Sequence, residues 1–379
     1  MPTTFAVVIT NYNYGRFVLE AVDSALAQSR APNRVIVIDD GSSDDSALRL
    51  TQTYGDDPRV ELVFSPNRGQ LAGFAAGVAR ADADVVCFLD ADDLWKPDYL
   101  ARLGALYDAR PDIDFVFSNL HQFEQAHGIE AFADAEEDLG HTAVMTYLTG
   151  AWYGASTSAL SLRLYWARRC TDFPEPFIRM WRLCADGCVV LSASIYGARK
   201  YYLPTNSVRY RVHGGNGWYA NRTDVSDYRE SIAKRGTVNY CAGLIGLAAD
   251  SAAMLPLELA TKPAPPDREI ARYRDVIERL ARDPAAVPPL DHLPLPRREP
   301  ARSLAKAAAP LPPPARAAGH PALAPPPDVV PAAEPSVAGI VPRRKIESAF
   351  IAIGQRSPWR HPRRYLRDIL RVVLQKPNV

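Results

Sequence analysis

Three aspartates follow an apolar run early in the chain. The run spans Val85–Leu89 without polar alternation, and Asp90, Asp92 and Asp93 come directly after it. Such a run is typical of a strand that is buried on both faces of a parallel sheet, and ligands bind beyond the carboxyl ends of these strands. Clustered carboxylates suit Mg²⁺ or Mn²⁺, which commonly bridges them to substrate phosphates. We therefore expect a metal site here; the alternative is a solvated turn with a helix cap.

Two other expected strands end in polar residues. Phe5–Thr10 is followed by Asn11–Asn13, and Arg34–Ile38 is followed by Asp39 and Asp40. Helical patterns separate these strands, and this alternation predicts an α/β fold with a parallel sheet covered by helices. The chain has no G-x-G-x-x-G after its first strand and no Walker A sequence, which argues against a dinucleotide cofactor or a glycine loop that cradles phosphates.

Four motifs in order resemble those of family 2 glycosyltransferases, which have the GT-A fold. They are Ile9–Asn13, Ile38–Asp44, Asn67–Gln70 and Phe88–Asp93. In the helix that follows the Asn67–Gln70 motif, many relatives carry an Asn at the position where this chain has Ala75. We interpret that departure as a difference in packing or specificity.

The resemblance implies roles for these residues. Thr10, Tyr12 and Asp40 would contact the base of a nucleotide sugar with Asp39 nearby, Asp90 would bind the ribose, and Asp92 would bind the metal with Asp93 close to it. Asn67 and Gln70 would also belong to the nucleotide-sugar site. A divalent cation there would neutralise the charge that develops on a leaving nucleoside diphosphate.

Asp186 is the one acid in the apolar, helix-like stretch Met180–Leu191. Burial raises the pKa of a carboxylate, which suits a general base that takes the proton from an acceptor hydroxyl. The family places its base on an Asp ahead of a helix here, usually after Glu, which Ala185 replaces in this chain. A helix-capping Asp would be compatible with that role. A single displacement with Asp186 as base predicts inversion at the anomeric carbon.

The stretch Val208–Val212 alternates like a strand and leads into His213. The sequence Tyr-Arg-x-His-x-x-Asn resembles the end of the family's catalytic domain, where the His approaches the metal or the diphosphate. The resemblance implies a metal role for His213 and added positive charge from Arg211 at the nucleotide sugar. A structural histidine is the alternative.

Two stretches between these motifs allow two interpretations each. Residues 121–140 are acidic and weakly patterned, so we expect a surface loop, with an acceptor-binding flap as the alternative. Residues 152–158 are aromatic and then small and polar. They fit either an acceptor-side wall, as in the family, or ordinary aromatic core.

The composition excludes some classes of function. The chain has 379 residues and a formal net charge of +1, which gives no reason to expect a nucleic-acid partner. Five scattered cysteines, an odd number, indicate reduced thiols in a cytoplasmic protein. We expect no signal peptide, and no apolar stretch approaches the roughly 20 residues that span a bilayer.

We expect four parts along the chain. Residues 1–225 would form the GT-A catalytic domain and residues 226–283 a helical extension. Residues 284–342, rich in Pro and Ala, are typical of a disordered linker. Residues 343–379 carry ten Lys or Arg against two acids, and predict a basic amphipathic tail. This tail would contact the inner face of a membrane, bind a partner or pack on the catalytic domain.

The sequence therefore predicts a metal-dependent inverting glycosyltransferase. It would move a sugar from a UDP-, dTDP- or GDP-linked donor to an acceptor hydroxyl, lipid-linked or on a polysaccharide, in cell-surface polysaccharide, glycolipid or glycoconjugate synthesis. One alternative is a sugar-phosphate nucleotidyltransferase, but Thr10–Asn13 is not the Gly-rich basic loop that a triphosphate requires. The other alternative is a non-catalytic nucleotide-sugar-binding or assembly protein. The chain retains five residues that together argue against it: Asp40, Asp90, Asp92, Asp186 and His213.

Overall fold

The computed structural model describes residues 1–216 and 223–282. The predicted linker 284–342 and the predicted basic tail 343–379 lie outside these residues and stay predictions.

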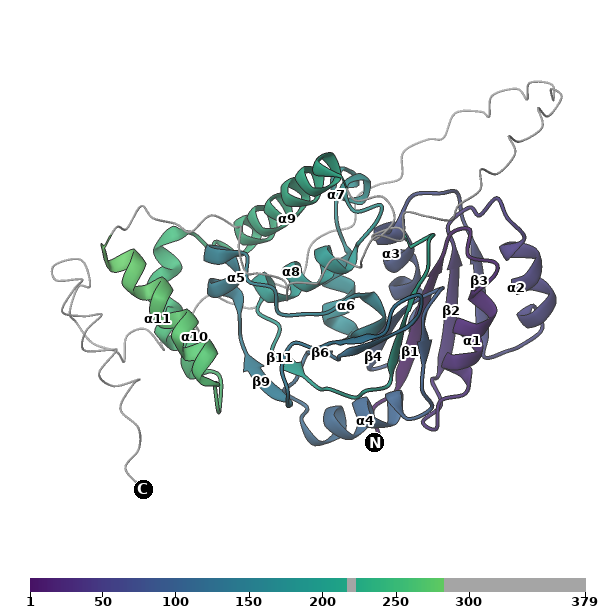
Figure 1. Ribbon diagram of the computed structural model, residues 1–379, viewed down its shortest axis with the longest axis horizontal. Helices are drawn as coiled ribbons and strands as arrows, with labels where there is room; N and C mark the ends of the chain where they lie inside the picture. Colours follow the sequence, from purple (N-terminus) through teal and green to yellow (C-terminus); the bar gives the residue numbers. More distant parts are fainter. Residues whose placement is uncertain (217–222, 283–379) are drawn as a thin grey trace, which may run out of the picture. The chain divides into compact units, whose positions relative to one another are not determined.

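A central eight-stranded sheet has the order β3-β2-β1-β4-β10-β6-β11-β9, which Figure 1 shows from β3 to β9. Its strands are β1 (Phe5–Asn11), β2 (Arg34–Asp39), β3 (Val60–Phe64), β4 (Val85–Asp90), β6 (Phe115–Phe117), β9 (Glu137–Gly140), β10 (Leu160–Arg163) and β11 (Lys200–Tyr202). Strands β1 to β4 are parallel, β10 runs antiparallel to β4 and β6, and β11 is again parallel to β6. The expected α/β fold with a mostly parallel sheet is confirmed.

A second, four-stranded sheet has the order β5-β12-β7-β8. Its strands are β5 (Leu94–Trp95), β7 (Leu120–Glu124), β8 (Gly128–Glu130) and β12 (Val208–Val212). The helices of the described residues are α1 (Val18–Leu26), α2 (Ser46–Tyr54), α3 (Gln70–Arg80), α4 (Tyr99–Ala109), α5 (Ala143–Thr149), α6 (Leu164–Thr171), α7 (Glu175–Met180), α8 (Asp186–Tyr196), α9 (Asp224–Ile245), α10 (Leu255–Ala260) and α11 (Asp267–Arg282). Short 3₁₀ turns lie at Thr157–Ala159 and Ala249–Met254.

Both faces of the central strands are covered by helices. Phe5, Val7 and Ile9 of β1 belong to the core that includes residues of α1, α2 and α4. Val8 points to the other face, where α3 packs on β1. A Cβ atom on Gly77 of α3 would lie only 2.4 Å from the Val8 side chain, so the helix can approach this closely only without one. Burial on both faces explains why the strands read as unbroken apolar runs.

The strand register brings the polar ends together. Thr10 of β1 pairs with Asp90 of β4, and Asn11 pairs with Asp39 of β2. The carboxyl ends of the first, second and fourth strands therefore meet at one edge of the sheet, as predicted.

The expectation of a surface loop over residues 121–140 is wrong in part, because β7, β8 and β9 lie in or at the edges of this stretch. The acids of β9 are paired with arginines from distant parts of the sequence. Asp138 binds Arg110 and Arg199, both at 2.8 Å, and Glu137 pairs with Arg268 of α11. These ion pairs let acidic residues occupy a strand.

The helical extension is present in α9, α10 and α11. The extension is interrupted at Gly246, which ends α9 and whose φ of +71° is the left-handed conformation that favours glycine. Among the described residues no single helix is long and apolar enough to cross a membrane. The two helical segments 224–245 and 249–260, bent by 82°, pass that test as a pair by length and composition only.

Candidate active site

Asp39 and Asp40 order the loops at the end of β2. Asp39 accepts hydrogen bonds from Asn11 Nδ2 and Ser42 Oγ, both at 2.7 Å. Asp40 accepts the backbone N–H groups of Arg68 at 2.8 Å and Gly69 at 2.7 Å. The two acids thus connect the first, second and third predicted motifs.

The other two predicted base contacts lie beside this cluster. Thr10 is partly buried at the end of β1, and Tyr12 in the following loop is exposed. Asn67 accepts a hydrogen bond from the Arg182 guanidinium. No contact between Tyr12 and Asp40 is present in the described structure.

Gln70 joins the donor-side residues to the start of α8. Its Nε2 donates to Asp90 Oδ1 at 2.9 Å, and its Oε1 accepts the Ala185 N–H at 2.9 Å. The backbone N–H of Gln70 also donates to the Arg182 carbonyl at 3.0 Å. The third motif therefore fixes the position of the loop that precedes Asp186.

Asp90 lies among several acids. Burial raises its pKa well above the usual range, and the charges of Asp92 and then Asp186 raise it further. The two contacts of Gln70, with Asp90 and with the Ala185 N–H, bring the start of α8, where Asp186 lies, to the same edge of the sheet. Nearby cations and hydrogen-bond donors favour the ionised form of such a carboxyl group and so lower its pKa again.

Asp92 and His213 are in direct contact. His213 Nε2 lies 3.0 Å from Asp92 Oδ2, which also accepts a hydrogen bond from Asn216 Nδ2 at 3.2 Å. The Gly215 N–H donates to His213 Nδ1, so in this arrangement the neutral ring carries its proton on Nε2 and donates to Asp92. The contacts of His213 and Asn216 with Asp92 both use Oδ2.

These residues fit a divalent cation that is completed by its substrate. No group of three or more His, Cys, Asp or Glu side chains within residues 1–216 and 223–282 is arranged to hold a metal ion alone. Mg²⁺ is commonly bound through one or two carboxylates together with substrate phosphates. Asp92, with His213 beside it, matches that donor set.

Asp93 has donors for both of its oxygens inside the protein. Ser158 Oγ donates to Oδ2 at 2.6 Å, and the Arg211 N–H donates to Oδ1 at 2.8 Å. The side chain is fully buried. Its contacts tie β12 and residue 158 to the end of β4. Its predicted place close to a metal stays a prediction.

Arg211 points into the protein. Its guanidinium binds Glu20 at 2.6 Å, pairs with Glu124 and donates to the Asp92 carbonyl at 2.7 Å. It also stacks on Phe17 and Phe123, 4.7 Å from each ring centroid. The sequence did not indicate this internal role, and the contact of Arg211 with a nucleotide sugar stays a prediction.

Asp186 begins α8 and is mostly buried. Burial raises its pKa to about 6; the Gly187 N–H and Lys234 act in the opposite direction, while Glu230 adds to the rise. The rise expected from the sequence is present. At neutral pH this carboxylate is ionised yet retains a useful affinity for protons, as a general base requires.

Several residues at the site gave no clear signal in the sequence. Thr157 and Ser158 lie in a stretch whose interpretation was open. Thr157 accepts a hydrogen bond from Gln70, and Ser158 contacts Asp90 at the end of β4 and Asp93 after it. Lys234 and Glu230 of α9 pair with each other at 2.5 Å and act on Asp186. Their positions on a polar helix with no recognised motif explain why sequence reasoning missed them.

Comparisons with known proteins agree with the motifs. Residues 6–131 match the model of the family described as Glycosyl transferase family 2. An uncharacterized glycosyltransferase of Nostoc sp. is 34% identical over 220 residues, which are 56% of this chain and 65% of the relative. The succinoglycan biosynthesis protein ExoU of Rhizobium meliloti is 36% identical over 139 residues, 35% of this chain and 39% of the relative.

Among solved structures, TarS of S. aureus in complex with UDP is similar at a TM-score of 0.46 and 15% identity, over 74% of this chain and 91% of that one. The matches span less than two thirds of the length of the Nostoc and R. meliloti relatives. The family match covers the ends of β1, β2 and β4 and the site residues up to Asp93. Asp186 and His213 lie outside it. Residues 6–131 are therefore similar to glycosyl transferase family 2 over the part of the chain that carries the four motifs.

Proposed function

We propose that this chain is a metal-dependent inverting glycosyltransferase with a nucleotide-diphosphate sugar as donor. The observation that carries the proposal is the double contact of Gln70, which holds Asp90 and the backbone before Asp186 together. A donor-binding carboxylate and a proton acceptor thereby face one edge of the sheet.

The donor's nucleoside would lie at Thr10, Tyr12, Asp39 and Asp40, with Asn67 and Gln70 beside it. One buried atom supports this placement: Asn11 Oδ1 has no hydrogen-bond donor within the described residues. A buried acceptor without a partner is costly, and an N–H group of a bound base would satisfy it. UDP-, dTDP- and GDP-linked sugars remain the three donor classes to test.

Asp92 would hold a Mg²⁺ or Mn²⁺ ion, with His213 in reach. When bound, the cation would supply positive charge to the leaving diphosphate. Ligation by Nε2 of His213 would require its proton to move to Nδ1, which now accepts the Gly215 N–H. In the described arrangement His213 and Asn216 orient Asp92, and Asp93 fixes the backbone around it.

Asp186 would take the proton from the acceptor hydroxyl as that oxygen attacks the anomeric carbon. The glycosidic bond forms as the bond to the nucleoside diphosphate breaks, and the diphosphate leaves with the electron pair. One displacement inverts the anomeric configuration. Because the acceptor oxygen attacks the anomeric carbon directly, this mechanism needs no carboxylate as a nucleophile.

The acceptor would be a hydroxyl of a glycan or of a lipid-linked sugar. The R. meliloti relative is named as a protein of succinoglycan biosynthesis, which supports a role in polysaccharide, glycolipid or glycoconjugate synthesis. A cytoplasmic location, at the inner face of the membrane, would match a donor made in the cytoplasm.

The anomeric configuration of the product tests the proposal. Nuclear magnetic resonance of the first product formed from an α-linked donor should show a β-linked sugar, before any equilibration. A product that keeps the donor's configuration contradicts single displacement by Asp186. Nucleotide-sugar binding with neither transfer nor hydrolysis would favour the non-catalytic alternative.

A further inference from the structure

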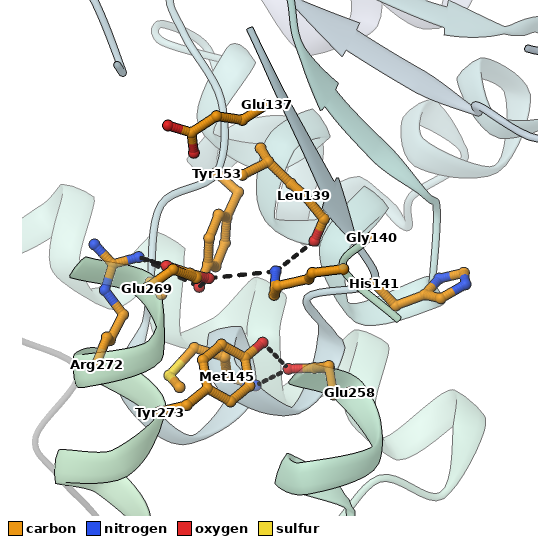
Figure 2. A network of polar contacts seen from close by, with 12 residues as sticks. Glu137, Leu139, Gly140, His141, Met145, Tyr153, Glu258, Glu269, Arg272 and Tyr273 are labelled. Carbon is orange, nitrogen blue, oxygen red and sulfur yellow. Dashed lines mark hydrogen bonds and ion pairs between the residues drawn. The ribbon is translucent and has the colours of Figure 1, made fainter. Parts of the chain in front are cut away.

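Tyr153 is held at both ends by buried groups. Its hydroxyl donates to Glu269 Oε1 of α11 at 2.7 Å, which Figure 2 shows from close by. Its carbonyl accepts a hydrogen bond from Lys200 Nζ of β11 at 2.9 Å, and the same nitrogen donates to the Val190 carbonyl of α8 at 2.8 Å. Tyr153 and Lys200 are both completely buried. The residue is thus fixed between the helical extension and the sheet.

The residues that follow Tyr153 lead directly to the candidate active site. A Cβ atom on Gly154 would lie 2.5 Å from Val190, so the backbone there rests on the helix that begins with Asp186. Further along, Ser158 Oγ donates to Asp93 at 2.6 Å and accepts the Asp90 N–H at 3.0 Å. A displacement of Tyr153 would therefore reach the aspartates of β4 and the start of α8.

The α11 end of this connection is itself firmly held. Glu269 pairs with Lys262 at 3.2 Å and with Arg272 at 2.9 Å, and its side chain is 4% exposed. Lys262 also donates to the Leu139 carbonyl of β9. Buried charges of this kind are ordered only when their partners are all in place.

We propose that Tyr153 is a positioning residue of the transferase. Through Glu269 it makes α10 and α11 part of the catalytic unit, because it sets where residues 154–158 present Ser158 to Asp90 and Asp93. The positioning role rests on the proposed function. It goes beyond that function because it assigns part of the active-site geometry to helices outside the family match, which ends at residue 131.

Two phenylalanine variants separate positioning from stability. Tyr153→Phe removes the hydroxyl that reaches Glu269. Tyr273→Phe is the matched control, because Tyr273 is also fully buried and donates to Glu258 Oε1 at the same 2.7 Å. Glu258 accepts the N–H groups of Val144 and Met145 and not of residues 154–158, as Figure 2 shows in part.

We expect amide hydrogen exchange at Ala159 and Asp90 to become about 10-fold faster in Tyr153→Phe and to stay unchanged in Tyr273→Phe. The kcat for transfer should fall about 5- to 20-fold in Tyr153→Phe alone, with the Kd for nucleoside diphosphate within a factor of two. Both variants should lose thermal stability, and Tyr153→Phe somewhat more, because the Tyr153 hydroxyl donates to Glu269 and also accepts from Arg272 Nη1 at 3.3 Å, whereas the Tyr273 hydroxyl donates to Glu258.

A second pair of variants, at Glu269, tests the same connection if Tyr153→Phe does not fold. Glu269→Gln keeps an oxygen that accepts the Tyr153 hydroxyl and should retain most of kcat, whereas Glu269→Ala should not. Equal changes in exchange and kcat for Tyr153→Phe and Tyr273→Phe would overturn the positioning role. If the wild-type chain neither transfers nor hydrolyses a donor, the proposed function fails, and the exchange comparison alone decides whether Tyr153 holds residues 154–158.

Discussion

Asp186 couples the proposed chemistry to stability. Its pKa is about 6 in the folded chain, raised mainly by burial from the ordinary value of 3.8. Between these two pH values the folded state binds a proton that the unfolded state has released. The contribution of this group to the free energy of unfolding therefore falls as pH rises from about 4 to about 6, and the ionised carboxylate is destabilising above that range.

Asp186→Asn should separate these two effects. At pH 7.5 we expect kcat to fall by about 10²–10⁴, because no base accepts the hydroxyl proton. At the same pH the free energy of unfolding should rise by up to about 3 kcal/mol, because the buried charge is gone. Thermal unfolding at pH 5 and pH 7.5 checks the sign, since the advantage of the variant should grow with pH.

The control for this variant is Asp172→Asn, which changes an exposed aspartate at the end of α6 and should alter neither quantity. An Asp186→Asn protein with wild-type kcat would remove Asp186 as the base. A variant that is less stable than wild type at pH 7.5 would show that the carboxylate is stabilised in its charged form.

The sequence identified the residues proposed to bind the metal or to accept a proton. It was less successful with residues that hold other side chains in place. Asp92, Asp186 and His213 lie in recognisable motifs, and the structure brings Asp92 and His213 into contact. Ser158 was missed because a serine carries no signal until its partner Asp93 is known. Arg211 was expected to bind the donor, because its charge is visible in the sequence while its partners Glu20 and Glu124 come from distant segments.

At the scale of elements, α3 positions the loop that carries Gln70. Gly73 and Gly77 face β1, and their lack of side chains lets the helix lie directly on Thr10 and Val8. The small residues of this helix, predicted from sequence only as a helix, thus have a packing reason. Gln70 is the first residue of α3. How closely α3 packs on β1 therefore determines where Gln70 contacts Asp90.

Gly77→Ala should destabilise the protein by about 1–3 kcal/mol, because the added methyl group overlaps Val8 within a packed core. Gly236→Ala in α9 is the matched control, since its added Cβ would meet no atom closer than 3.9 Å. That variant should gain about 0.5–1 kcal/mol from helix propensity. Urea denaturation measures both. A neutral Gly77→Ala variant would contradict the close packing of α3 on β1.

Periodicity predicted the first strands of the sheet and the helices between them because their apolar patterns are local. It failed for β9, whose charged residues depend on Arg110, Arg199 and Arg268 from three other elements. It also gave no hint that α10 and α11 bury Glu258, Lys262 and Glu269. Charged residues on a helix normally indicate a solvent-facing side, and only the three-dimensional contacts show the exception.

At the scale of the whole molecule, the basic segment 343–379 remains to be placed. We propose that it brings the enzyme to an anionic membrane surface, on the ground of its ten Lys or Arg against two acids. The full chain should float with anionic liposomes, whereas a chain that ends at Pro342 should not. Neutral liposomes are the control for charge. Equal flotation of the two chains with anionic liposomes would remove the proposal.

The central claim is that Asp92 binds a nucleoside diphosphate through a divalent cation. The most direct test is calorimetric titration of UDP, GDP and dTDP, with Mn²⁺ and with a chelator, into wild type, Asp92→Asn and Asp275→Asn. Asp275 is an exposed acid of α11 that pairs with Arg279, and serves as the control. We predict Mn²⁺-dependent binding of one nucleotide by wild type and Asp275→Asn, lost in Asp92→Asn. Binding that persists in Asp92→Asn or in the chelator, or no binding of any of the three, would contradict the account.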